Sequence, residues 1–222
     1  MKFSIVTIFP HIFDSFLNES LIKRARDKKI IQFNILNLRD FSSDKHKTVD
    51  AAPYGGGPGM VMKVEPFYQA LEKIKRNQNK AIQRKIVLLA PSGKQFNQKT
   101  AKKFSKLDEL VLLCGRYEGV DARVEKFIDE KISIGPYVLN GGEVAAMVVV
   151  EAVCRLIPGF LGNIKSLDEE TFSFAAGKKS EYPQYTRPEV FQVKGKKYKV
   201  PSVLLSGDHK KIKQWREKRK KR

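Results

Sequence analysis

Apolar runs of strand length alternate with helical patterns from Met1 to Gly159, and this alternation constrains the fold more than any other feature. The runs typical of buried strands are KFSIVTIF (2–9), IIQFNILNL (30–38), KIVLLAP (85–91), ELVLLCG (109–115) and KISIG (131–135). Helical spacing of apolar residues begins at Pro10 and at about Pro66, and recurs over about 98–107, 120–128 and 143–157. Strands that alternate with helices predict an α/β fold with a mostly parallel sheet.

Three of the expected strands end in turns rich in glycine and other special residues: APSGK (90–94), CGRYEG (114–119) and GPYVLNGGE (135–143). Ligands bind at the carboxyl ends of strands in open α/β sheets, where glycines let backbone N–H and C=O groups approach closely. We therefore expect the three turns to outline one pocket. None reads G-x-G-x-x-G, and PSGKQ lacks the spacing and the Ser/Thr of a phosphate-binding loop, so a dinucleotide or nucleoside triphosphate ligand is disfavoured.

The chain is strongly basic, with 43 lysines and arginines against 24 acids and a formal net charge of +19. Such a charge favours a polyanionic partner, although a lysine-rich proteome would also explain it. Residues 195–222 hold 12 lysines and arginines against 2 acids. We therefore expect this tail to bind nucleic acid or a membrane surface.

Compartment and domain limits follow from composition along the chain. No apolar run approaches the ~18 residues of a membrane span, and the N-terminus lacks a small-residue cleavage site, which predicts a cytoplasmic protein. Cys114 and Cys154 lie in apolar runs, as buried thiols in a reducing compartment do.

We expect one domain over 1–159, a linker over 160–187, and a small, basic, mainly helical appendage over 188–222 with a final helix from Lys210.

Five further segments occur in a fixed order: VDAAPYGGGPGM (49–60), CGRYEGVDARV (114–124), SIGPYVLNGGE (133–143), YPQYTRPEV (182–190) and VLLSGDHKKIKQWR (203–216). In order and spacing they resemble the bacterial tRNA (guanine-N1)-methyltransferase family known as TrmD. The resemblance implies a SPOUT-class domain with a C-terminal trefoil knot, an obligate homodimer, and S-adenosylmethionine bound in the knot. Periodicity reveals no knot, and chains are in general unknotted.

By this resemblance, 133–143 is the knot loop that holds the adenine and ribose of the methyl donor. The donor-site residues that it implies are Pro91, Gly115, Glu118, Ile134, Gly135, Pro136, Tyr137, Val138, Leu139, Gly141 and Gly142. Ordinary turn and core roles are the alternative, above all for Val138 and Leu139. Pro136 and Ala145 stand where the family often has Asp and Pro, so the loop is expected to differ slightly. A side chain at Gly141 is expected to block donor binding without unfolding the protein.

Methylation of guanine N1 requires a base, because N1 carries a proton at neutral pH, and a cation or donor that stabilises charge on O6. The resemblance implies that Glu170 is the base, where the family has Asp, with Asp168 as a substitute. It assigns Arg155 to O6. An ion pair from Glu151 to Arg155 is the structural alternative. For the acidic linker, the alternative is a capping box from Ser166 to Glu169.

The resemblance also places His46, Asp50, Gly57 and Gly59 near the target base, within the long polar loop 39–60. A base modified on its Watson–Crick edge must leave the stack, and a glycine-rich loop is suited to enclosing it. Family members continue well past the element that ends at Arg216, so we expect grip on tRNA to depend on charge in REKRKKR and hence on salt.

The implied function is transfer of a methyl group from S-adenosylmethionine to N1 of the guanosine immediately 3′ of the tRNA anticodon. Two alternatives remain open from the sequence: a catalytically weakened basic RNA-binding protein, and a related knotted methyltransferase of ribosomal RNA. The family also suggests Mg²⁺, although no metal-ligand cluster is visible in the sequence.

Overall fold

The computed structural model of the chain describes residues 1–76, 82–162 and 182–219. The chain forms two compact units, Met1–Gly162 and Asn163–Arg222. Most of the expected linker, residues 163–181, lies outside the described residues. No helix among the described residues is long and apolar enough to cross a membrane.

A five-stranded sheet with the order β2-β1-β6-β5-β7 forms the centre of the first unit, and every pairing in it is parallel. Its strands are β1 (Lys2–Thr7), β2 (Gln32–Asn37), β5 (Arg84–Gln95), β6 (Glu109–Cys114) and β7 (Glu130–Ser133). Ile5 lies between Ile35 on one side and Leu112 on the other, so large apolar side chains align across neighbouring strands. The predicted parallel α/β sheet is confirmed.

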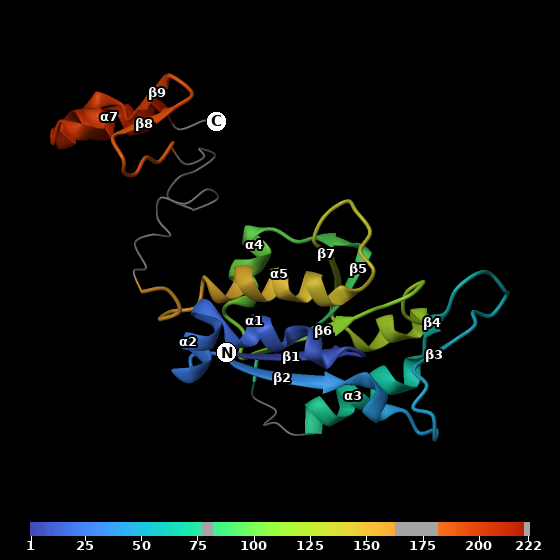
Figure 1. Cartoon of the computed structure of the whole chain (residues 1–222). Helices are drawn as coiled ribbons and strands as arrows, with labels where there is room; N and C mark the ends of the chain where they lie inside the picture. Colours follow the sequence, from blue (N-terminus) through green and yellow to red (C-terminus); the bar gives the residue numbers. More distant parts are fainter. Residues whose placement is uncertain (77–81, 163–181, 220–222) are drawn as a thin grey trace. The chain divides into compact units, whose positions relative to one another are not determined.

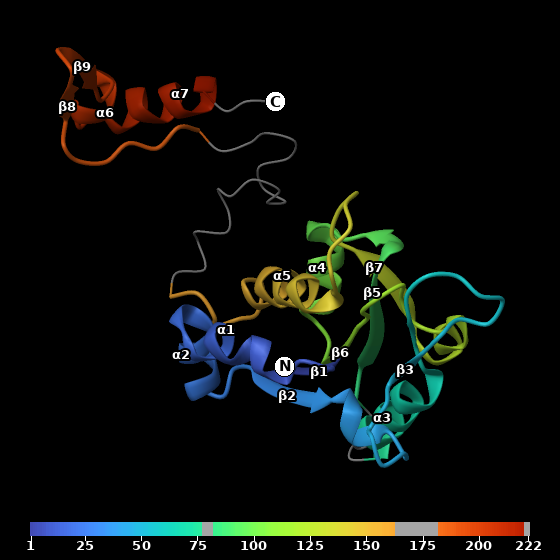
Figure 2. The same cartoon turned by 45° about the vertical axis from the view of Figure 1, so that its right-hand side comes forward.

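Helices cover both faces of this sheet, as Figures 1 and 2 show. One face carries Ile5, Val87 and Leu112 and packs against α1 (Asp14–Asn18), α2 (Ser20–Asp27), α4 (Gln98–Phe104) and α5 (Gly142–Cys154). The opposite face carries Val6, Leu88 and Val111 and packs against α3 (Val64–Arg76) and the 3-10 helix η3 (Ala122–Phe127). Successive strand residues point to opposite faces, so each strand buries apolar residues in both layers.

The helix expected from Pro10 is broken into three pieces, which corrects that prediction. The 3-10 helix η1 (Pro10–Phe13) leads into α1, and α2 begins at Ser20, whose φ is 52°, directly after the extended Glu19. The break turns the chain so that Leu17 before it and Ile22 after it reach the same core cluster. The helix expected over 120–128 is likewise only the 3-10 helix η3.

Strand β5 runs to Gln95, past its expected end at Pro91, and its pairing with β7 shifts between Leu89 and Lys94. Gly93 lies in this irregular part. A Cβ there would lie 2.5 Å from the backbone nitrogen of Ile132. Only glycine therefore allows the end of β5 to pass this close to β7.

The long polar loop contains the 3-10 helix η2 (Leu38–Phe41) and an antiparallel pair formed by β3 (Asp50–Ala51) and β4 (Val61–Met62). The segment between these two strands projects from the sheet as an arm (Figure 1). Four of its glycines, Gly55, Gly56, Gly57 and Gly59, have positive φ.

The described part of the second unit contains a hairpin of β8 (Val190–Val193) and β9 (Lys196–Lys199), followed by α6 (Ser202–Leu205) and α7 (His209–Arg219). The expected final helix is confirmed, whereas the hairpin was not foreseen. Aromatic contacts tie α7 to the segment before the hairpin: Tyr185 packs edge-on against Trp215, and the Arg216 guanidinium lies over the Tyr182 ring.

Glu109 is a buried carboxylate at the start of β6 that links three parts of the sheet. It accepts a hydrogen bond from Ser4 Oγ at 2.7 Å and one from Arg84 Nε at 2.6 Å, and it lies 3.2 Å from Lys2 Nζ. Burial raises its pKa, but the hydrogen bonds from Ser4, Arg84 and Lys2 outweigh burial and hold the pKa below the ordinary value of 4.5.

This lowered pKa predicts how stability depends on pH. A carboxylate whose pKa is lower in the folded than in the unfolded state contributes stability above the unfolded value, and that contribution is lost as pH falls through the folded value. We expect the free energy of unfolding to decrease as the pH drops below about 4.5. The decrease should be less steep in Glu109→Gln. Urea titrations of both proteins over pH 3–7 measure the difference. Parallel pH profiles would assign the acid sensitivity to other carboxylates.

Candidate functional site

A cavity of about 510 Å³ lies at the carboxyl ends of β5, β6 and β7. All three glycine-bearing turns contribute to its wall, which confirms the expectation that they outline one pocket. Of the residues expected at a donor site, those on the wall are Pro91, Gly115, Glu118, Ile134, Gly135, Tyr137, Val138, Leu139, Gly141 and Gly142. Pro136 belongs to the same loop but does not line the cavity.

The cavity wall combines apolar side chains with exposed backbone. Ile132, Ile134 and Leu139 supply apolar surface, and the small Ala145 of α5 leaves room between the turns. A volume in the range of small-molecule sites, with apolar walls and a few polar groups, suits a small organic ligand that has both apolar surface and hydrogen-bonding groups.

The loop 135–142 is fixed at both ends by hydrogen bonds. Ser133 Oγ donates to Gly135 O at 2.9 Å, and at the other end Gly142 N donates to Gly115 O at 2.9 Å. A Cβ on Gly142 would lie 2.8 Å from Cys114 Cα, so glycine is needed where the loop meets the end of β6. Both ends of the loop are therefore anchored to neighbouring backbone.

A buried network centred on Glu143 holds this loop against the turn 114–119. Glu143 is 1% exposed, and its Oε1 accepts from the Thr7 hydroxyl at 2.7 Å while its Oε2 accepts from Arg116 Nε at 2.9 Å. Arg116 Nη1 donates to Asn140 O at 3.4 Å, and its guanidinium lies over the Phe9 ring. The sequence analysis missed these residues. The one signal was an acid in the first turn of an otherwise apolar helix.

This network corrects the expectation for Gly141. A Cβ at Gly141 would collide with Arg116 Nε and would lie 2.6 Å from Glu143 Oε2. A substitution at Gly141 would therefore disturb the buried ion pair, and loss of ligand binding in such a variant would not separate a filled cavity from a damaged fold.

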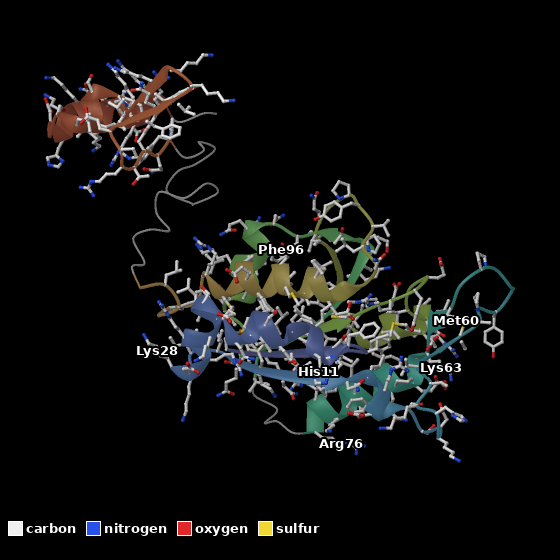
Figure 3. The ribbon with its side chains drawn as sticks, in the orientation of Figure 1. His11, Lys28, Met60, Lys63, Arg76 and Phe96 are labelled. Carbon is white, nitrogen blue, oxygen red and sulfur yellow. The ribbon has the colours of Figure 1, made fainter. Side chains whose placement is uncertain are left out.

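The glycine-rich arm is joined to the rim of the cavity. Glu118 N donates to Met60 O at 3.1 Å, and Met62 N donates to Gly119 O at 3.0 Å. Gly59 lies so close to Glu118 that a Cβ would be 2.6 Å from Glu118 Cγ. Figure 3 labels Met60 and Lys63 where the arm returns to the body of the unit. Gly59 is thus the expected RNA-site residue that lies against a residue of the cavity wall, Glu118.

The other three expected RNA-site residues lie elsewhere on the arm and the loop before it. Asp50 of β3 pairs with Met62 of β4, and Gly57 lies in the glycine-rich part of the arm. His46 is exposed, and its N–H donates to Asp44 Oδ1 at 2.9 Å. Hydrogen bonds from the hydroxyl of Thr48, then from that of Ser42, lower the pKa of Asp44 well below its usual range, so Asp44 holds this turn as a carboxylate.

Of the two expected catalytic residues, Arg155 is described, and it does not line the cavity of its own chain. Arg155 follows the last residue of α5, and its N–H donates to Glu151 O. The 13-residue helix begins at the cavity, so Arg155 lies about 20 Å away along its axis. Glu170, Asp168 and the Ser166–Glu169 pair lie outside the described residues. Among the described residues, no group of three or more His, Cys, Asp or Glu is arranged to hold a metal ion.

We predict that removal of the Glu143 carboxylate is costly. Glu143→Ala leaves the Thr7 hydroxyl and Arg116 Nε without their acceptor, and breaking a buried ion pair costs about 3–5 kcal/mol. Arg123→Ala is the matched control, because Arg123 pairs with Asp121 on the surface, where 61% of its side chain is exposed, and solvent-exposed pairs contribute little to stability. Chemical denaturation measures both. Equal losses would show that the buried network contributes no more to stability than a surface ion pair.

The sequence also matches a family of known proteins. The profile of the family described as tRNA (Guanine-1)-methyltransferase TrmD matches residues 1–222. A tRNA (guanine-N(1)-)-methyltransferase of Dictyoglomus turgidum is 50% identical over 98% of this chain and 84% of its own length. Proteins of the same name from Citrifermentans bemidjiense and Clostridium botulinum are 51% and 46% identical to this chain. Each match covers 98% of this chain, and the two matches cover 84% and 85% of the respective relative. The chain belongs to the TrmD family.

Proposed function

We propose that this protein transfers a methyl group from S-adenosylmethionine to N1 of the guanosine immediately 3′ of the tRNA anticodon. The observation that carries the proposal is the cavity at the ends of β5, β6 and β7, whose wall contains ten of the eleven residues that the family resemblance implies for the donor site. Membership of the family supplies the reaction class.

The cavity fits the proposed donor in size and chemistry. Apolar side chains such as Ile134 and Leu139 suit the two faces of an adenine ring, and the backbone of the turns suits its hydrogen-bonding edge. S-adenosylmethionine supplies a methyl group activated by its positive sulfonium. Glu118, on the same wall, places a carboxylate at the rim where the arm is attached.

In the proposed reaction, Glu170 removes the N1 proton and Arg155 stabilises the negative charge that develops on O6. The arm from Asp50 to Met62 encloses the extruded base, with His46 and Gly59 beside it. The second unit, with the basic residues of 188–222, holds the tRNA. Residues 160–187 form the linker that carries the catalytic base, Glu170. Mg²⁺ has no proposed ligands here.

A second copy of the chain completes the site in this proposal. Arg155 and the cavity are at opposite ends of α5, so one chain cannot bring both to one guanine. Val144 and Val148 lie one turn apart on α5 and are 51% and 43% exposed. An isologous contact between antiparallel α5 helices would bury this apolar face and bring Arg155 of the partner subunit toward the cavity. Sedimentation as an active monomer would overturn this arrangement.

The remaining features of the proposal concern the chain path and the compartment. We assign the segment from β7 through α5 to a SPOUT-type trefoil knot. The close passage of Gly93 over Ile132 supports this assignment, because it brings the end of β5 against the start of the loop that lines the cavity. The tRNA substrate implies a cytoplasmic enzyme.

Nucleoside mass spectrometry tests the reaction and its base. Incubation of tRNA with protein and donor is expected to give 1-methylguanosine, and Glu170→Gln is expected to lower single-turnover rates by roughly 10²–10⁴-fold with donor affinity nearly unchanged. Asp168→Asn is the control and should cost little, while Glu170→Asp should keep or raise the rate. Full loss in Asp168→Asn with Glu170→Gln still active would reassign the base. Product only on ribosomal RNA, or none, would overturn the proposed function.

Leu139→Ser tests the donor cavity without touching the buried network. Leu139 is 39% exposed, so the fold loses little, while the cavity loses an apolar wall. We expect donor affinity to fall about tenfold, the equivalent of about 1.4 kcal/mol. Leu205→Ser, at a half-exposed leucine of α6 in the second unit, is the matched control and should bind the donor normally. Calorimetry that shows equal affinities in both variants would move the donor site elsewhere.

A further inference from the structure

The hairpin of the second unit presents two aromatic rings on one face. Phe191 and Tyr198 are directly opposite each other in the antiparallel register, their ring centroids are 6.3 Å apart, and the rings are inclined by 34°. They are 55% and 56% exposed. Val193, two residues along on the same face, is 41% exposed. A contiguous apolar patch of this kind on a small unit marks an interaction site.

Every charged residue of the hairpin is a lysine. Between Val190 and Lys199 the chain has four lysines and no acid. Lys196 is opposite Val193 and therefore points to the same face as the two rings. Lys194 and Gly195 both have positive φ, as a tight two-residue turn requires, so the turn fixes the register that pairs the rings. The rings and Lys196 thus form one preformed surface.

Charge decides which partner fits this surface. A second copy of the same face would bring lysine against lysine, which disfavours an isologous contact. An RNA base presents a flat π-face that stacks on aromatic rings, and its phosphate presents the negative charge that a neighbouring lysine attracts. Base-paired RNA hides its π-faces inside the helix, so the fit is to an unpaired base.

We propose that Phe191 and Tyr198 form a stacking platform for an unpaired base of the substrate RNA, with Lys196 on the adjoining phosphate. The identification of the RNA as tRNA, and of the base as one in its anticodon loop, rests on the proposed function. The platform is a specificity element separate from the cavity, and it selects looped over paired RNA.

Binding measurements on the full chain test the platform. The probes are a transcript of a tRNA anticodon stem-loop and a blunt RNA duplex of equal length, both titrated without methyl donor at several salt concentrations. Phe191→Leu and Tyr198→Leu keep apolar bulk but remove the π-face. Each is expected to weaken stem-loop binding by about 5- to 150-fold, leave duplex binding unchanged, and leave the salt slope unchanged. Lys196→Ala should instead reduce the salt slope by about 1.

Matched variants separate stacking from damage to the unit. Phe191→Tyr and Tyr198→Phe keep an aromatic ring at each position and should bind the stem-loop as the wild type does. Leu205→Ala removes a half-exposed apolar side chain of α6 outside the hairpin and should also have no effect.

Three results would overturn the platform: wild-type stem-loop affinity in both leucine variants, equal losses for stem-loop and duplex, or a changed sedimentation coefficient in the leucine variants, which would mark a protein interface. These outcomes are independent of the proposed reaction. If the wild type methylates tRNA and the leucine variants keep their stem-loop affinity, the platform alone is rejected. If no 1-methylguanosine forms, the proposed function is rejected and the binding result still stands.

Discussion

The buried carboxylate of Glu143 is the interaction on which the cavity depends. It joins Thr7 at the end of β1, Arg116 in the turn after β6, and the first turn of α5, three segments that are far apart in the sequence. A charge that is 1% exposed is tolerable only when its acceptor sites are filled, and here both oxygens are. The loop 135–142 is thereby held open over the sheet edge as a preformed wall, which lowers the ordering cost of binding.

The same turn that contacts Glu143 also carries the glycine-rich arm. Arg116 faces the buried network, while Glu118 and Gly119, a few residues later, bond to Met60 and Met62 of the arm. The wall of the proposed donor cavity and the proposed RNA-binding arm are thus joined by backbone hydrogen bonds. A shift of this turn would move both, so these hydrogen bonds couple the two parts of the proposed site directly.

Local patterns in the sequence predicted the features that depend on short-range preferences, and missed the features that depend on contacts between distant segments. The alternation of apolar runs predicted the parallel sheet, and glycines at three strand ends predicted that the turns line one cavity, because both follow from short-range preferences. The break at Glu19 and Ser20 was missed because the helical spacing continues across it, and only packing of Leu17 and Ile22 in one core decides against a straight helix. The Thr7–Glu143 bond spans 136 residues, beyond any spacing rule. The β8–β9 hairpin had a readable signal, Lys194–Gly195 between two strand-like runs.

Helix α5 explains why a single chain leaves the proposed chemistry incomplete. Its first turn supplies part of the cavity wall through Gly142 and Ala145, and Arg155 follows its last residue. Because a helix is rigid over this length, no motion of side chains brings the two ends together. The exposed Val144 and Val148 lie between them. In the proposed dimer, burial of this apolar face would stabilise the pair of subunits, and the same antiparallel pairing would bring the arginine of one chain toward the cavity of the other.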